Sequence, residues 1–215
     1  MSFMVRSAEL RARARASLDG IWGRSALHLL LAYIVIGVPL GLINLIPVIG
    51  YIATLVITGA LTLGIYGYYM EIARGDKNVS FGTYFSGFNQ FVEAFLLYLL
   101  MAIFTFLWML LLIIPGIIAG LRYSQAYYIL RDNPGIGALE AINRSKQMMD
   151  GHKWRYFVLG LTFIGWALLA CLTFGIGMLW LYPYMLTAYA HFHEDLKGRT
   201  YSNTPPPLDG PGFAG

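Results

Sequence analysis

The sequence predicts an all-α fold, a polytopic membrane helix bundle with six transmembrane helices arranged as three hairpins and with amphipathic helices at the membrane interface. Composition is the first reason, because 58% of the residues are hydrophobic and 12% are charged, whereas soluble domains carry about 25% charged residues. The second reason is that apolar runs recur until about residue 190. The third is that the charged residues collect between alternate runs.

The longest apolar stretch predicts the central hairpin. Residues 91–114 are apolar apart from Glu93, Tyr98 and Thr105, and such a helix is long enough for a hydrocarbon layer about 30 Å thick. Pro115 and the glycine after it interrupt this helix, because proline breaks the helical hydrogen-bond ladder. A second apolar run then continues to residue 131.

Two further apolar pairs predict the other hairpins, at 26–45 with 49–70 and at 156–174 with 178–196. The domain organisation follows: an amphipathic arm over 1–25, a membrane domain over 26–197 and a tail over 198–215. The tail is rich in proline and glycine with little apolar content, so we expect it to be disordered.

Charge distribution predicts the topology. The three hairpin turns carry no Lys, Arg, Asp or Glu, and fourteen of the fifteen basic residues lie in the arm, the longer connections or the C-terminal end. The exception is Arg122. By the positive-inside rule, both termini are expected in the cytoplasm.

The arm contains the first amphipathic helix. Leu10, Ala14 and Leu18 form one face, and arginines occupy much of the rest. We expect this helix to lie on lipid headgroups, with an RNA- or partner-binding arm as the alternative. The residues predicted to contact headgroups are Arg11, Arg13, Arg15, Trp22, Arg24, Trp154 and Arg155.

Two further segments are predicted to be amphipathic helices. Aromatic residues at helical spacing over 81–88 follow Ser80, a possible cap. Asn133 and Pro134 resemble a helix start, and the helix that they would open ends at Gly151. Its predicted apolar stripe consists of Ala138, Ile142, Ser145 and Met149.

Arg122 is the strongest candidate for a functional residue. An arginine at mid-membrane depth costs about 2.5–3.5 kcal/mol on insertion scales, so it needs a partner or a wet cavity. It is interpreted either as a structural pin, bonded to backbone carbonyls or to Glu93, or as part of an anion or ion pathway. Glu93 by default meets the headgroups.

Tyrosine is concentrated in the second helix of each predicted hairpin. Tyr66, Tyr123 and Tyr184 are expected deepest and are candidates to line a groove or pathway. The alternative is an aromatic belt with interhelical hydrogen bonds.

Motifs typical of enzymes are absent from the sequence, including Gly-x-Ser-x-Gly, His-Glu-x-x-His and Cys-x-x-Cys. The group His191, His193, Glu194 and Asp195 lies where the chain meets water, and we do not expect a metal there. Cys171 is alone and cannot form an internal disulfide. The sequence therefore indicates no catalysis, no cofactor and no metal.

Several segments together resemble a bacterial integral membrane family catalogued as domain of unknown function 975. They include IPGIIAGLRYS, RDNP, MMDGHKWRYF, LTFGIGMLWLYPYM, AYAHFHEDL and, near the N-terminus, LDGIWGRSA. The resemblance implies a multi-pass protein of the bacterial inner membrane and supplies no reaction or ligand. The chain departs from the pattern at His193, where an aromatic residue is expected, and in its proline-rich tail.

Two functions remain open at this stage. The leading hypothesis is a non-enzymatic accessory or regulatory membrane protein that binds lipid or partner proteins, including further copies of itself, but not nucleic acid. The alternative is a small-solute or ion transporter or channel that uses Arg122 and the embedded tyrosines.

Overall fold

The computed structural model describes residues 7–203, apart from the side chains of Leu111 and of residues 199–203, and all regular secondary structure in this range is helical. The helices are α1 (Ser7–Leu18), α2 (Trp22–Ala32), η1 (Tyr33–Gly37), α3 (Val38–Ile43), α4 (Pro47–Ala73), η2 (Phe81–Gln90), α5 (Phe91–Leu111), α6 (Ile113–Tyr123), α7 (Ala126–Asp132), α8 (Ala138–Met148), α9 (Lys153–Leu172) and α10 (Met178–Asn203).

The first helix pair consists of α2, η1 and α3 followed by α4. The first three elements form one continuous helix with a π-helical turn at η1, and this wider turn lies directly before Pro39, which lacks the N–H that an α-helix needs. A short turn around Asn44 leads into α4. Both helices of the pair are long and apolar enough to cross a membrane.

The second pair differs from the prediction, because the expected single helix after Pro115 is two short helices. Helix α6 has 11 residues, a length of about 16 Å, and the chain turns at Ser124 and Gln125 before α7 begins. The hydroxyl of Ser145 on α8 serves this break: it donates to the carbonyl of Arg122 at 2.7 Å and accepts the Gln125 N–H at 3.2 Å.

Helices α9 and α10 form the third pair. Four stretches of the described chain reach membrane-spanning length and hydropathy, namely Trp22–Ile43, Pro47–Ala73, Phe81–Leu110 and Lys153–Leu172. Helix α10 contains Pro183 and continues to Asn203, so the first residues of the predicted tail are helical. The rest of that tail, and residues 1–6 of the arm, lie outside the described residues.

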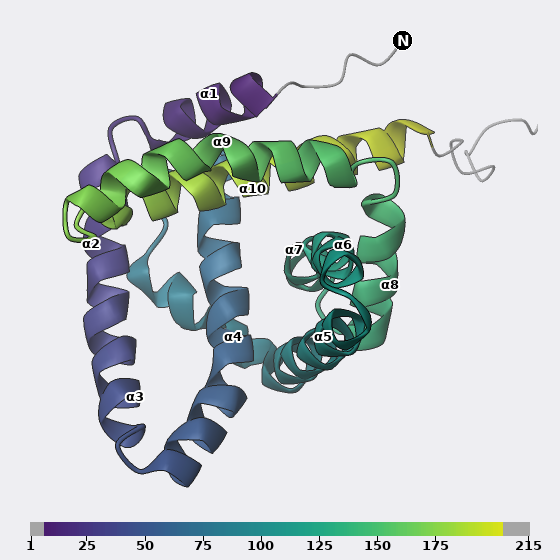
Figure 1. Cartoon of the computed structure of the whole chain (residues 1–215). Coiled ribbons are helices and arrows are strands. Elements are labelled where there is room, and N and C mark those ends of the chain that lie inside the picture. Colours follow the sequence, from purple (N-terminus) through teal and green to yellow (C-terminus); the bar gives the residue numbers. More distant parts are fainter. Residues whose placement is uncertain (1–6, 204–215) are drawn as a thin grey trace, which may run out of the picture.

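The three helix pairs run in different directions (Figure 1). Helices α5 and α6 are seen nearly end-on, whereas α3 and α4 run down the picture and α9 and α10 run across it. The turns between paired helices expose apolar side chains, with Leu45 78%, Leu112 67% and Phe174 100% accessible. Opposite these tips, the polar ends of α4, α7 and α10 meet.

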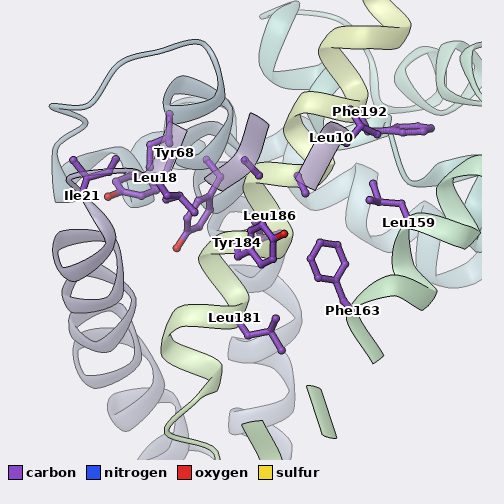
Figure 2. Packing of buried hydrophobic residues seen from close by; sticks show 14 of the residues in the cluster. Leu10, Leu18, Ile21, Tyr68, Leu159, Phe163, Leu181, Tyr184, Leu186 and Phe192 are labelled. Carbon is purple, nitrogen blue, oxygen red and sulfur yellow. The ribbon is translucent and has the colours of Figure 1, made fainter. Parts of the chain in front are cut away.

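The largest buried cluster joins the first and third pairs through α1. Leu10, Ala14 and Leu18 are each 0% exposed and pack in the same cluster as Phe163 and Tyr184. Figure 2 shows part of this cluster. The predicted apolar face of the arm is therefore real, but it faces α10 and the core and not lipid.

Helix η2 also packs inward and does not lie free in an interface. Tyr84 is 0% exposed, and a Cβ added to Gly64 of α4 would overlap the carbonyl oxygen of Tyr84. Ser80 makes no side-chain cap hydrogen bond, contrary to the prediction. The absence of side chains at Gly64 and Gly87 allows α4 and η2 to approach closely.

The connection before α8 differs in detail from its prediction. Asn133 closes α7, with its side chain donating to the Ile129 carbonyl at 2.8 Å, and Gly137 precedes the first turn of α8. The predicted stripe of α8 is confirmed, because all four of its residues are buried. Gly20 and Gly151 both adopt positive φ, +79° and +73°, and each follows an aspartate, so two similar Asp-Gly turns precede α2 and α9.

Candidate functional site

Asp132, the last residue of α7, is the centre of a polar network where the helix pairs meet. Its Oδ1 accepts a hydrogen bond from Nη2 of Arg74 at 2.6 Å, and its Oδ2 accepts one from Nζ of Lys197 at 2.7 Å. Nε2 of His193 lies 3.5 Å from the same Oδ2. One carboxylate thereby connects α4, α7 and α10.

Arg74 extends the network to a second carboxylate. Its Nε donates to Oε1 of Glu194 at 2.8 Å, and its Nη2 lies 2.6 Å from the same oxygen. Arg74 therefore bridges Asp132 on α7 and Glu194 on α10.

A neighbouring ion pair ties α7 to α4 and η2. Arg131 donates to Oε1 of Glu71 at 2.8 Å and to the hydroxyl of Ser86 at 2.9 Å. The guanidinium passes close over Gly67, where an added Cβ would lie 2.8 Å from Nε of Arg131. This close approach requires the small residue of α4.

His193 is the most deeply placed polar side chain of the network, with 1% of its surface exposed. Its ring stacks on Tyr128, with centroids 4.9 Å apart, and its Nδ1 lies within hydrogen-bond distance of Oε1 of Gln125, at 3.1 Å. The planar imidazole thus packs as an aromatic ring would, and it also has polar contacts with Gln125 and Asp132.

These contacts alter the acidity of Asp132. Burial on its own would raise the pKa of this carboxyl group, but hydrogen bonds from His193, Lys197 and Arg74 together hold its pKa well below the ordinary value. For Arg74, burial acts to lower the pKa and the bonds to Asp132 and Glu194 outweigh it, so the pKa is raised. Both groups are therefore charged at neutral pH.

Beside the network lies a groove of about 370 Å³. Its lining residues are Ile129, Asp132, Asn133, Arg144, Gln147, Met148, His193 and Lys197. Asp132 and Lys197 bond each other, so the charges in the groove are largely neutralised within the protein. The ion pairs therefore hold the polar ends of α4, α7 and α10 together.

Arg122, the strongest candidate from the sequence, is exposed at the end of α6. It lies near Asp150, whose pKa is lowered first by the hydrogen bond from Lys153 and also by the charge of Arg122. Asp150 is in the turn between α8 and α9. The break after α6 therefore places Arg122 near a polar turn and not in an enclosed apolar core.

The other predicted pathway residues lie in different parts of the core. Tyr66 packs against Tyr128, with ring centroids 4.7 Å apart. Tyr123 is buried beside Phe104, and Glu93 is half-buried in the first turn of α5. Tyr184 accepts a hydrogen bond from Nη1 of Arg15 at 2.9 Å. The five candidates therefore do not line one common cavity.

The predicted headgroup residues also have varied surroundings. Arg13 pairs with Glu9 at 2.5 Å, and Arg24 donates to the Lys77 carbonyl at 3.0 Å. Arg11 is half-buried, Trp22 is half-buried beside Tyr184, and Trp154 is 72% exposed.

Arg155, also predicted to contact headgroups, lies largely inside the protein. Its side chain is 11% exposed, pairs with Asp195 at 2.6 Å and lies over the ring of Phe192. This residue joins α9 to α10 inside the protein, so at most a small part of it is available to lipid.

Two apolar grooves open between the helix pairs. The larger, of about 840 Å³, lies between the first pair and the α9–α10 turn, with Leu30, Tyr33 and Ile176 among its lining residues. The smaller, of about 400 Å³, lies between the start of α2 and the third pair. Its lining includes three tryptophans, together with Arg15 and Tyr184.

The polar network was not anticipated from the sequence. Its members stand in three short stretches, EIAR, RDNP and HEDLK, each at the polar end of an apolar helix. Because all three stretches follow apolar helices, the sequence could have predicted that they lie at the same side of the molecule. Their pairing across 58 to 120 residues was not readable from a single sequence.

Within the described residues, no group of three or more His, Cys, Asp or Glu side chains is placed to hold a metal ion. His191, from the histidine-rich end of α10, bonds the hydroxyl of Ser17 at 2.9 Å. His193 contacts Gln125 and Asp132 on the other side of that helix.

Comparison with known protein families found one described as "Protein of unknown function (DUF975)", which matches residues 4–119 and 109–200. The chain belongs to this family. The matched residues include α1 and all three helix pairs, so the resemblance noted from the motifs is confirmed. Comparisons with curated proteins and with solved structures found no match. Membership of DUF975 brings with it no assigned reaction, ligand or partner.

Proposed function

We propose that this DUF975 protein is a non-enzymatic lipid-binding protein of the bacterial inner membrane. In this proposal the three helix pairs cross the membrane as six segments, the fourth of which is α6 and α7 together with the break between them, and the polar network and both termini lie on the cytoplasmic side. Lipid binding serves an accessory or regulatory role, in which the helix pairs hold lipid between them.

The observation that carries the proposal is the separation of polar and apolar surface. Exposed apolar side chains gather at the three helix-pair turns, whereas the ion pairs of Asp132, Arg74 and Arg131 lie at the opposite ends. Such a molecule is stable where its tips are in hydrocarbon and its polar ends are in water.

The two apolar grooves support lipid as the ligand. Volumes of about 400 and 840 Å³ fall within the range of about 300–1,000 Å³ that is usual for ligand sites. Both grooves lie next to the exposed apolar tips, where acyl chains surround a membrane protein. A water-soluble ligand would gain little from walls that are almost entirely apolar.

Transport has less support, because its candidate residues are dispersed. Arg122 is exposed at a helix end, and Tyr123 and Tyr184 belong to different buried clusters. A pathway would have to pass through both cores.

The proposal is tested on protein purified in mild detergent and examined by native mass spectrometry after detergent exchange. We expect phospholipid to remain bound at about one or more molecules per chain. A proteoliposome flux assay tests transport in parallel, with Arg122→Ala compared with Arg144→Ala, an exposed arginine paired with Glu140. Complete loss of lipid, together with a flux that disappears in Arg122→Ala alone, would contradict the proposal.

A further inference from the structure

We propose that the smaller apolar groove binds one anionic glycerophospholipid, with its phosphate at Arg15 and an acyl chain along α9 and α10. This inference rests on the proposed lipid-binding function and assigns its ligand class and its site.

Arg15 is held at the mouth of the groove by a specific contact. Its Nη1 donates to the hydroxyl of Tyr184 at 2.9 Å, and its guanidinium lies 6.0 Å from the centre of that ring. The residue is nevertheless exposed. Because guanidinium has five N–H donors, one edge can bond Tyr184 while another meets a phosphate oxygen.

The groove then continues along apolar side chains toward the α9–α10 turn. Its α10 wall runs from Tyr184 past Trp180 toward Gly177 in the turn before α10, and Trp166 and Leu169 form much of its α9 wall. The six-residue separation between Tyr184 and Met178, the first residue of α10, corresponds to about 9 Å of helix. A cation at one end and an apolar channel of this length fit an amphiphile with an acidic head.

Arg15 and Trp22 mark one end of the groove. Trp22 packs against Tyr184, with ring centroids 6.0 Å apart, and so lies at the same end of the groove as Arg15. The phosphate end of the lipid therefore belongs beside Arg15 and Trp22, and the chain end beside Leu169.

The charge of the groove selects an anionic lipid. Among the described residues that line it, Arg15 carries the charge and the others are neutral. The nearby carboxylate of Glu9 is paired with Arg13. A zwitterionic headgroup would bring a cation next to Arg15, whereas phosphatidylglycerol brings none.

The test titrates delipidated full-length protein with phosphatidylglycerol or phosphatidylcholine and follows binding by native mass spectrometry. We expect the parent to prefer phosphatidylglycerol. Arg15→Gln should weaken phosphatidylglycerol binding about tenfold or more, because a charge-assisted hydrogen bond is lost. Arg15→Lys should keep the preference, and Arg144→Gln, at an exposed arginine on α8 outside the groove, should leave binding unchanged.

A second pair of variants tests the acyl-chain part without changing charge. Leu169→Trp fills the groove and should weaken binding, whereas Leu168→Trp, at a neighbouring residue that is 65% exposed, should not. If the parent binds both lipids equally, or if each variant matches its control, the assigned site is wrong although lipid binding stands. If the parent binds neither lipid, the proposed function fails with it.

Discussion

Asp132 is the residue on which the polar ends of three helices depend. Its side chain is 11% exposed, and its partners Arg74 and Lys197 are about one third exposed. Pairs of this kind lie between surface ion pairs, worth up to about 1 kcal/mol, and fully buried pairs, whose disruption costs about 3–5 kcal/mol.

Asp132→Asn should lower the free energy of unfolding by about 1–3 kcal/mol, because two cations lose their common carboxylate. The measurement is the unfolding midpoint in detergent micelles. Glu140→Gln is the control, since its pair with Arg144 is about half exposed on both sides. Equal effects of the two substitutions would show that Asp132 does not hold the helices together.

The depressed pKa of Asp132 also predicts how stability changes with pH. A carboxyl group whose pKa is lower in the folded protein contributes stability above its ordinary pKa, 3.8, and this contribution is lost as the pH falls below that value toward the folded-state pKa. The stability difference between parent and Asp132→Asn should therefore be constant from pH 5 to 7 and shrink below about pH 4. A difference that stays constant down to pH 3 would contradict this account.

At the scale of the helices, the break between α6 and α7 decides where the polar residues of this segment lie. Ser145 satisfies a donor and an acceptor that the break removes from the helical ladder, and both Ser145 and Gln125 are 0% exposed. Because the break ends α6 at Tyr123, it also fixes the position of Arg122.

Ser145→Ala should reduce stability by about 1–3 kcal/mol, the cost of leaving a buried backbone group unsatisfied. Ser80→Ala is a matched control, because Ser80 is exposed and makes no cap hydrogen bond. Thermal unfolding of the two variants in the same detergent gives the comparison. If Ser145→Ala is as stable as the control, the hydroxyl is not what supports the break.

Sequence patterns predicted helices well where a single face of the helix is buried. The stripes of α1 and α8 were found correctly because buried residues recur at helical spacing. The α6–α7 break was missed because the apolar run is continuous there, and its support comes from Ser145, twenty residues after Gln125. The target of the α1 stripe was also missed, since periodicity shows that a face is buried but not what covers it.

For the whole molecule, the sequence predicted that the turns are uncharged and the opposite helix ends are charged. It did not predict the directions in which the helix pairs run. Uncharged turns correctly marked the three exposed tips, because ionic side chains are costly in hydrocarbon. The differing directions of the helix pairs (Figure 1) depend on contacts such as Arg74 with Glu194 and Arg155 with Asp195. For the same reason, the candidate residues Arg122, Tyr66 and Tyr184 could be named from sequence but not placed relative to one another.

The orientation of the molecule in the membrane is the central claim, and cysteine labelling tests it most directly. Single cysteines replace Asn44, in the first apolar turn, or Asn78, after α4 among polar residues, in a Cys171→Ala background that removes the exposed native thiol. With a membrane-impermeant maleimide, the account predicts that position 44 reacts in intact cells and that position 78 reacts only after the inner membrane is permeabilised. Labelling of position 78, but not of position 44, in intact cells would contradict it.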